Sequence, residues 1–126
     1  MIKFIEGMPD DVLGKEAIGK ITHADYRDTL VPEVQKRLNR GVLKILYVIG
    51  PEFTGYEPMA IMDDAALGLR HWREFPFIAL VTDIDWIRNA VRMFVPFFPG
   101  EIRLFSLSEK EEALSWILDV KPAVKA

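Results

Sequence analysis

Two short apolar runs constrain the fold of this chain more than any other feature of its sequence. "VLKILYVIG" (residues 42–50) and "FPFIALVTD" (residues 75–83) are rich in β-branched and aromatic side chains. This composition is typical of strands that are buried on both faces, as in a parallel sheet covered by helices. Both runs are far shorter than the ~20 residues that a membrane-spanning helix needs. They therefore predict the central strands of an α/β domain.

Helical periodicity separates these strands. Behind "THAD" (residues 22–25), which has the form of a capping box, apolar residues recur every four positions as far as Leu38. Pro32 interrupts this first helix and predicts a kink or a restart. Pro58 is suited to the first position of a second helix, which we expect to continue to about Arg73.

Two further helices follow capping boxes of the same form. "TDID" (residues 82–85) precedes a third helix, which Pro96 and Pro99 end, and "SEKE" (residues 108–111) precedes a fourth. In the second helix, one broad apolar arc is expected to pack on the sheet. It comprises Met59, Ile61, Met62, Ala65, Ala66, Leu69 and Trp72.

The remaining segments supply the other strands. Met1–Glu6 and Val12–Ile21 are extended stretches joined by a turn and predict an antiparallel hairpin, whereas residues 51–56 are expected to form a loop. Residues 101–107 alternate and predict a fifth strand. The order predicts one α/β domain over residues 1–126, with a five-stranded mixed sheet and four helices.

The composition argues against several classes of function. A net charge of −3 without a basic block argues against nucleic acid as the main partner. The chain has no cysteine, and its two histidines, His23 and His71, form no metal-binding pair. No phosphate-cradling, dinucleotide or nucleophile-elbow motif is present. We therefore expect no metal, no cofactor and no catalysis. The sequence begins without a signal-peptide pattern, so we expect a cytoplasmic protein.

The element order resembles that of the SpoIIAA-like family, as do "GKITHADY" (residues 19–26), "DIDW" (residues 83–86) and "FFPGEIRLF" (residues 97–105). The family consists of small bacterial proteins related in fold to the STAS domain of sulfate transporters and anti-sigma antagonists. The lipid-binding CRAL-TRIO fold is a more distant likeness. The resemblance covers nearly the whole chain. It implies the fold more firmly than the function, because most members have no assigned activity.

The junction between the third strand and the second helix departs from the STAS pattern. STAS antagonists carry a phosphorylatable serine there, but this junction reads "IGPEFTGYEP" (residues 49–58) and contains no serine. Thr54 is its only aliphatic hydroxyl. We interpret Thr54 as an ordinary threonine and expect STAS-type kinases to leave it unmodified.

The second helix carries the densest group of titratable side chains, Asp63, Asp64, Arg70 and His71. A carboxylate and an imidazole could carry out acid–base chemistry. However, Asp64 and His71 are two helical turns apart, about 10 Å along the axis. We interpret the group as a solvated helix face opposite the apolar arc.

Asp83 and Asp85 follow a predicted parallel strand, where ligands often bind in open α/β sheets. The interpretation that they cap the third helix is favoured, and both roles are compatible. Arg88 and Arg92 are expected on the outer face of that helix. Two arginines are fewer than stable membrane anchoring needs, so they support peripheral membrane contact only weakly.

The aromatic residues at the end of the third helix predict an apolar rim for a ligand or a protein partner. We expect Phe97 to be buried, Phe98 to lie at the rim, and Gly100 to permit the turn into the fifth strand. The proposed recess has six rim residues: Asp83, Trp86, Phe94, Phe97, Phe98 and Pro99. In the alternative interpretation, which stays open, the phenylalanines simply complete the core.

Three classes of function remain open. The first is a non-catalytic STAS-like module that binds a protein partner, and the second is a carrier of a small apolar or lipid-like ligand. An enzyme of unknown type is the third. A closed apolar cavity beneath the third helix would favour the carrier, and a flat apolar patch would favour the module. The hydrophobic content of 50% and the mean hydropathy of +0.10 also favour a homodimer.

Overall fold

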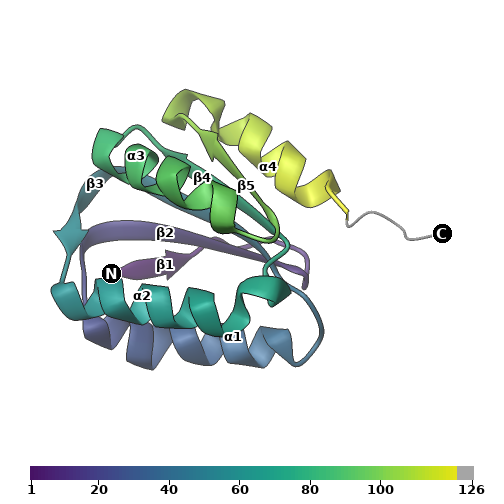
Figure 1. Ribbon diagram of the computed structural model, residues 1–126, viewed down its shortest axis with the longest axis horizontal. Coiled ribbons are helices and arrows are strands. Elements are labelled where there is room, and N and C mark those ends of the chain that lie inside the picture. The colour runs from purple at the N-terminus through teal and green to yellow at the C-terminus, as the bar shows by residue number, and fades with distance from the viewer. Residues whose placement is uncertain (122–126) are drawn as a thin grey trace.

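A computed structural model describes residues 1–121 and contains a five-stranded mixed sheet with helices on both faces (Figure 1). The strands lie in chain order, the first pair antiparallel and the others parallel. This fold confirms the sequence prediction, although residues 122–126 of the predicted domain lie outside the described part. The strands are β1 (Ile2–Phe4), β2 (Val12–Ile21), β3 (Lys44–Tyr56), β4 (Phe77–Thr82) and β5 (Glu101–Phe105).

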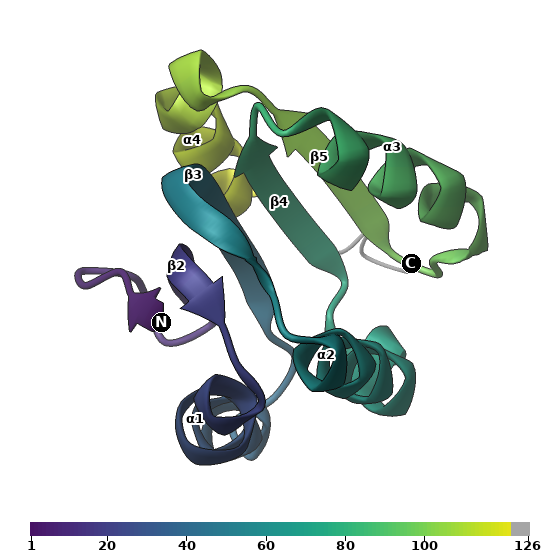
Figure 2. The same ribbon diagram turned by 90° about the vertical axis from the view of Figure 1, so that its left-hand side faces the viewer.

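Three helices cover one face of the sheet, and α4 covers the other (Figure 2). The helices are α1 (Val31–Leu38), α2 (Pro58–His71), α3 (Asp85–Phe94) and α4 (Lys110–Asp119). A π-helix, Asp25–Leu30, leads into α1, so the predicted restart falls next to Pro32. Among residues 1–121, no helix has the length and hydropathy required to cross a membrane.

The alternation of strand side chains divides the interior into two cores. On the α4 face, Ala113 and Ile117 pack on Leu46, Val48 and other strand residues. On the opposite face, Tyr26, Leu30 and Val34 of the π-helix and α1 pack on the sheet. This second core also receives Ala60 from α2 and Ile87 from α3, which are the only buried residues of those helices. The face under α2 and α3 is therefore incompletely filled.

The predicted loop over residues 51–56 is wrong, because β3 continues to Tyr56. The register between β2 and β3 shifts around Gly19, after which Gly19 pairs with Phe53 and Lys20 with Gly55. Gly19 and Gly55 have φ angles of +64° and +143°, which glycine adopts without the steric cost of a side chain. The bulge thus allows a strand to continue where the sequence signalled a turn.

Of the three predicted capping boxes, only the first is confirmed. The Thr22 amide donates to Asp25 Oδ2 at 2.9 Å, and the Asp25 amide donates to Thr22 Oγ1 at 3.1 Å. Thr82 instead ends β4 and accepts from the Ile84 amide, without a cap from Asp85. The third box lies two residues early, at Ser106 and Glu109, because β5 ends sooner than expected.

Candidate functional site

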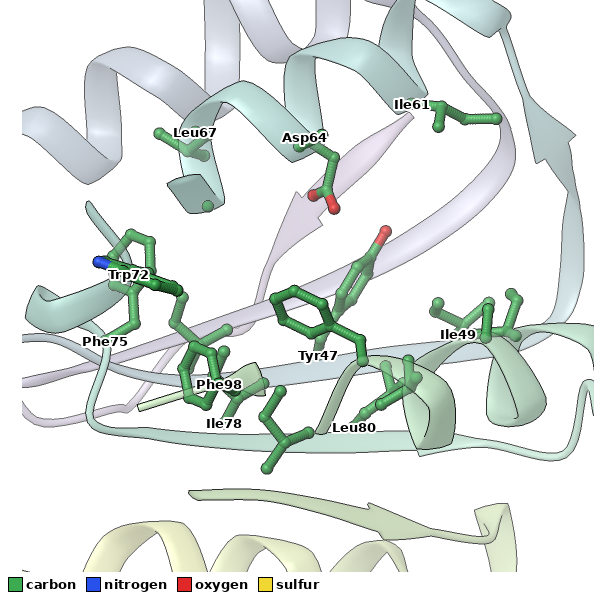
Figure 3. A pocket seen from close by; sticks show the side chains of 18 of the residues that line it. Tyr47, Ile49, Ile61, Asp64, Leu67, Trp72, Phe75, Ile78, Leu80 and Phe98 are labelled. Carbon is green, nitrogen blue, oxygen red and sulfur yellow. The ribbon is translucent and has the colours of Figure 1, made fainter. Parts of the chain in front are cut away.

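An apolar pocket of about 510 Å³ lies between α2 and α3, above the sheet (Figure 3). Its volume falls within the roughly 300–1,000 Å³ that small-molecule sites occupy. Side chains of the sheet form the floor of the pocket. The parallel register places Ile45, Ile78 and Ile102 in one row and Tyr47 beside Leu80. The floor is thus a continuous layer of side chains from three strands.

The helices form walls whose apolar side chains are not covered. On α2, Ile61 and Leu69 are 52% and 67% exposed, and on α3, Trp86 is 56% exposed. All three line the pocket. The prediction that the whole apolar arc of α2 packs on the sheet is therefore wrong, because most residues of this arc line the open pocket. The pocket is neither the closed cavity nor the flat patch that the sequence considerations distinguished.

Asp64 is exposed, but it lies on the wall of this pocket and not on a face opposite the apolar arc. Apart from Leu67, the α2 residues that line the pocket follow a helical stripe, which continues to Trp72 in the 3₁₀ turn after α2. Figure 3 shows the Asp64 side chain extending from α2 into the pocket, with Tyr47 rising toward it from the sheet. The members of the stripe are Ile61, Asp64, Ala65, Gly68, Leu69 and Trp72.

The polar groups gather at one end of the pocket. The Tyr26 hydroxyl donates to Asp64 Oδ1 at 2.7 Å, and the hydroxyls of Tyr47 and Tyr56 share a hydrogen bond of 2.7 Å. Lys15 reaches the pocket from β2, with its Nζ 4.0 Å from the centroid of the Tyr47 ring. Tyrosine hydroxyls, a carboxylate and an ammonium thus adjoin an otherwise apolar space.

Burial dominates the electrostatics of this polar end. Burial lowers the pKa of Lys15, whereas the nearby charge of Asp64 raises it. Burial also raises the pKa of Tyr47 and of Tyr56. The two tyrosine hydroxyls therefore stay protonated at neutral pH and act as neutral hydrogen-bonding groups.

The other titratable residues of α2 belong to separate contacts. His23 Nδ1 lies 2.5 Å from Asp63 Oδ2, and His71 Nδ1 lies 2.9 Å from Glu74 Oε1. Arg70 borders a smaller hollow next to His23 and Asp63. Asp63, Asp64, Arg70 and His71 therefore do not assemble into one site. The His23 contact instead joins α2 to the segment before the π-helix.

The six predicted rim residues do not all lie at the pocket. Trp86, Phe94 and Phe98 line the pocket, whereas Pro99 is exposed and lies outside its lining. Asp83 is also outside this lining, and it accepts a hydrogen bond from the Leu107 amide at 3.0 Å. Asp83 therefore connects the ends of two segments and does not face the recess.

The predicted burial of Phe97 is wrong, because its side chain is 73% exposed. After α3 ends at Phe94, residues Val95–Phe97 form a 3₁₀ turn, whose tighter winding changes the direction of successive side chains. Phe98 then packs on the core, with its ring 6.0 Å from that of Phe94.

Gly100 is needed for a close approach, not for an unusual turn. A Cβ at this position would lie 2.4 Å from the Pro76 carbonyl oxygen. Arg88 also differs from its predicted place on the outer face of α3. Its guanidinium donates to the carbonyls of Thr82 and Phe105 at 2.8 and 3.0 Å, and so ties the ends of β4 and β5 together.

The sequence interpretation missed Lys15 as a site residue. Its position in β2 nevertheless carried a signal, because Leu13, Lys15 and Ala17 share one face of the strand. Leu13 and Ala17 are core residues, so a lysine between them is out of place on an inward face. A lysine on the inward face of β2, where the strand pattern predicts an apolar residue, is therefore the sequence signal for the polar end of the pocket.

Comparisons with known proteins agree with this fold. The SpoIIAA-like family model matches residues 12–118. The crystal structure of an uncharacterized protein from the DUF3478 family, with a SpoIIAA-like fold, from Shewanella loihica PV-4 is 31% identical and has a TM-score of 0.71. The alignment covers 93% of this chain and 92% of that one. The chain belongs to the SpoIIAA-like family.

A more distant structure is that of the anti-sigma factor antagonist SpoIIAA in its unphosphorylated form. It is 12% identical, with a TM-score of 0.64, and the alignment covers 95% of this chain and 100% of that one. At this identity the similarity concerns the fold alone. A search of curated proteins finds no match.

Proposed function

We propose that this protein is a non-catalytic binding protein that holds a small apolar molecule between α2 and α3. The observation that carries the proposal is the apolar pocket of about 510 Å³ on the sheet, whose walls keep large side chains exposed. Apolar surface removed from water contributes roughly 25 cal/mol per Å². A ligand in the pocket would cover side chains that the fold itself leaves in contact with water.

The pocket favours a ligand carrier over a module that binds only proteins. Protein partners usually cover a broad surface with a flat or gently curved core. Here the floor lies beneath two separate helices, and Trp86, Phe94 and Phe98 border the space from one side. This depth suits a small molecule that fits among these side chains.

A protein partner is the second candidate. Apolar side chains outside the pocket lining support it, since Met59 and Met62 on α2 and Met93 on α3 are each at least half exposed. A second copy of the chain is one such partner, in line with the predicted homodimer. Residues of α2 and α3 line the pocket, so a partner that covers both helices would also control access to a ligand.

Blocking the pocket from α2 tests the proposed function. Gly68 lines the pocket, and a Cβ placed there meets no atom within 4 Å. Gly68→Leu should therefore fold and direct its side chain into the space that a ligand would occupy. Ala66→Leu is the matched control, because Ala66 is on the same helix but outside this pocket.

Two measurements read out the result. Native mass spectrometry of freshly purified protein should show a retained ligand in the wild type and in Ala66→Leu, and less of it in Gly68→Leu. Titration with dodecanol, followed by tryptophan fluorescence of Trp72 and Trp86, covers the case in which purification strips the ligand. Equal dodecanol affinity in all three proteins, or no binding in any, would contradict the proposed function.

A further inference from the structure

Lys15 is placed where a soluble domain rarely puts a cation. It is 5% exposed and lies on the inward face of β2, paired in register with Tyr47 of β3. Lysines are almost never fully buried unless they are paired. Its position in the lining of the pocket therefore requires an explanation beyond packing.

The other buried lysine shows what a structural role looks like. Lys44 is 6% exposed, and its Nζ lies 3.1 Å from the Val120 carbonyl oxygen and 3.6 Å from the Asp11 carboxylate. Within residues 1–121, the Lys15 ammonium has neither a hydrogen bond nor an ion pair, and its close contact is the face of the Tyr47 ring. The Lys15 nitrogen is not one of the fully buried atoms that lack a partner, so it opens onto the pocket that Lys15 lines. Lys15 thus lacks an anion.

The neighbouring carboxylate does not supply this partner. Asp64 Oδ1 accepts from the Tyr26 hydroxyl, and Asp64 influences Lys15 as a nearby charge without forming an ion pair with it. The nearby hydroxyls of Tyr47 and Tyr56 bond to each other. The Lys15 ammonium is therefore the group at the polar end that has no hydrogen-bonding partner. A ligand with a hydrogen-bond acceptor could supply this partner.

The rest of the pocket sets the shape of the ligand. Beyond Lys15, Tyr47, Tyr56 and Asp64, the lining is made of aliphatic and aromatic side chains. A molecule that pairs with the Lys15 ammonium and also covers the apolar lining has an anionic head and an apolar tail. We infer that the pocket selects amphiphilic anions and that Lys15 binds their head group by charge-assisted hydrogen bonds. This inference rests on the proposed function and names its ligand class.

The test compares three probes that share one tail and differ in the head. Laurate, dodecyl phosphate and dodecanol are titrated below their micellar concentrations by calorimetry. We expect at least one of the two anions to bind about tenfold or more tightly than dodecanol, because hydrogen bonds to charged groups are the stronger ones. The tighter anion identifies whether a carboxylate or a phosphate head is preferred.

Lys15→Met tests the residue, because it keeps the length of the side chain and removes the charge. It should reduce affinity for the preferred anion about tenfold and leave dodecanol binding unchanged. Lys20→Met, at an exposed position of the same strand, is the control for net charge. Unchanged anion affinity in folded Lys15→Met would overturn the inference.

Asp64→Asn provides an independent measurement that leaves Lys15 intact. Removing the carboxylate charge should tighten anion binding, because Asp64 repels an anionic head next to Lys15, and should leave dodecanol unaffected. Weaker anion binding in Asp64→Asn would overturn the inference. If dodecanol bound the wild type as tightly as both anions, the inference about Lys15 would be overturned and the proposed function would stand. If no probe bound, both the inference and the proposed function would be overturned.

Discussion

Phe97 and Phe98 are adjacent, identical side chains with opposite surroundings, so their alanine variants form a matched pair. Phe98→Ala should reduce the free energy of unfolding by about 2 kcal/mol, because truncation of a fully buried phenylalanine costs roughly 3–5 kcal/mol and Phe98 is only partly buried. Phe97 is 73% exposed, so Phe97→Ala should change stability by less than about 0.5 kcal/mol.

The expected difference of about 1.5 kcal/mol is large enough for urea unfolding followed by circular dichroism. The slope of unfolding free energy against urea should be equal in the wild type and both variants, so that the midpoints report stability directly. Phe98→Leu serves as a control that retains an apolar side chain and should lose less than Phe98→Ala. If Phe97→Ala proved as destabilising as Phe98→Ala, the assignment of Phe98 to the core and of Phe97 to solvent would be refuted.

Four further predictions concern three single positions and the self-association of the chain. Gly100→Ala should destabilise the fold by more than about 1 kcal/mol, measured by urea unfolding, because its Cβ would clash with the Pro76 carbonyl. Lys15→Met should stabilise the apo protein by about 1 kcal/mol at neutral pH. Burial lowers the pKa of Lys15 in the folded state, so the wild type gains stability as pH rises from the folded-state pKa of Lys15 toward its unfolded-state pKa. Thermal melts at alkaline pH should therefore show the stability advantage of Lys15→Met shrinking over this range. Thr54 lies within β3, so mass spectrometry after incubation with STAS-type kinases should find no phosphate on it. Sedimentation equilibrium at tens of micromolar should show a dimer, and a monomer would contradict the prediction of self-association.

The sheet and its helices were predictable because their signals are local and agree with one another. The β-branched runs at the centres of β3 and β4 require burial on both faces, and the helical repeats between them require a parallel arrangement. Element ends were less predictable. The continuation of β3 through Gly55 depends on a bulge in β2, which is a partner strand far away in the sequence.

The lining of the pocket was only half predictable, for a physical reason. The apolar arc of α2 was assumed to be covered by the sheet, as amphipathic helices usually are. In the structure this arc borders an open space, so the pattern of apolar residues does not distinguish a packed wall from a pocket wall. Asp64 was then assigned to the solvated side, although its spacing of three from Ile61 places it on the pocket-facing stripe.

Two separate departures from what folding favours meet at the same place. The apolar side chains of α2 and α3 stay exposed although the sheet beneath them could bury them, and Lys15 is buried although the strand could have carried an apolar residue there. Each departure lowers stability, and neither explains the other, since one concerns the helices and the other the central sheet. Local inconsistencies of this kind are expected at functional sites. A ligand with an apolar tail and an anionic head would relieve both, because its tail would cover the walls while its head would pair with the ammonium. That one molecule would account for two unrelated departures is the strongest reason to propose the space between α2 and α3 as the site of function.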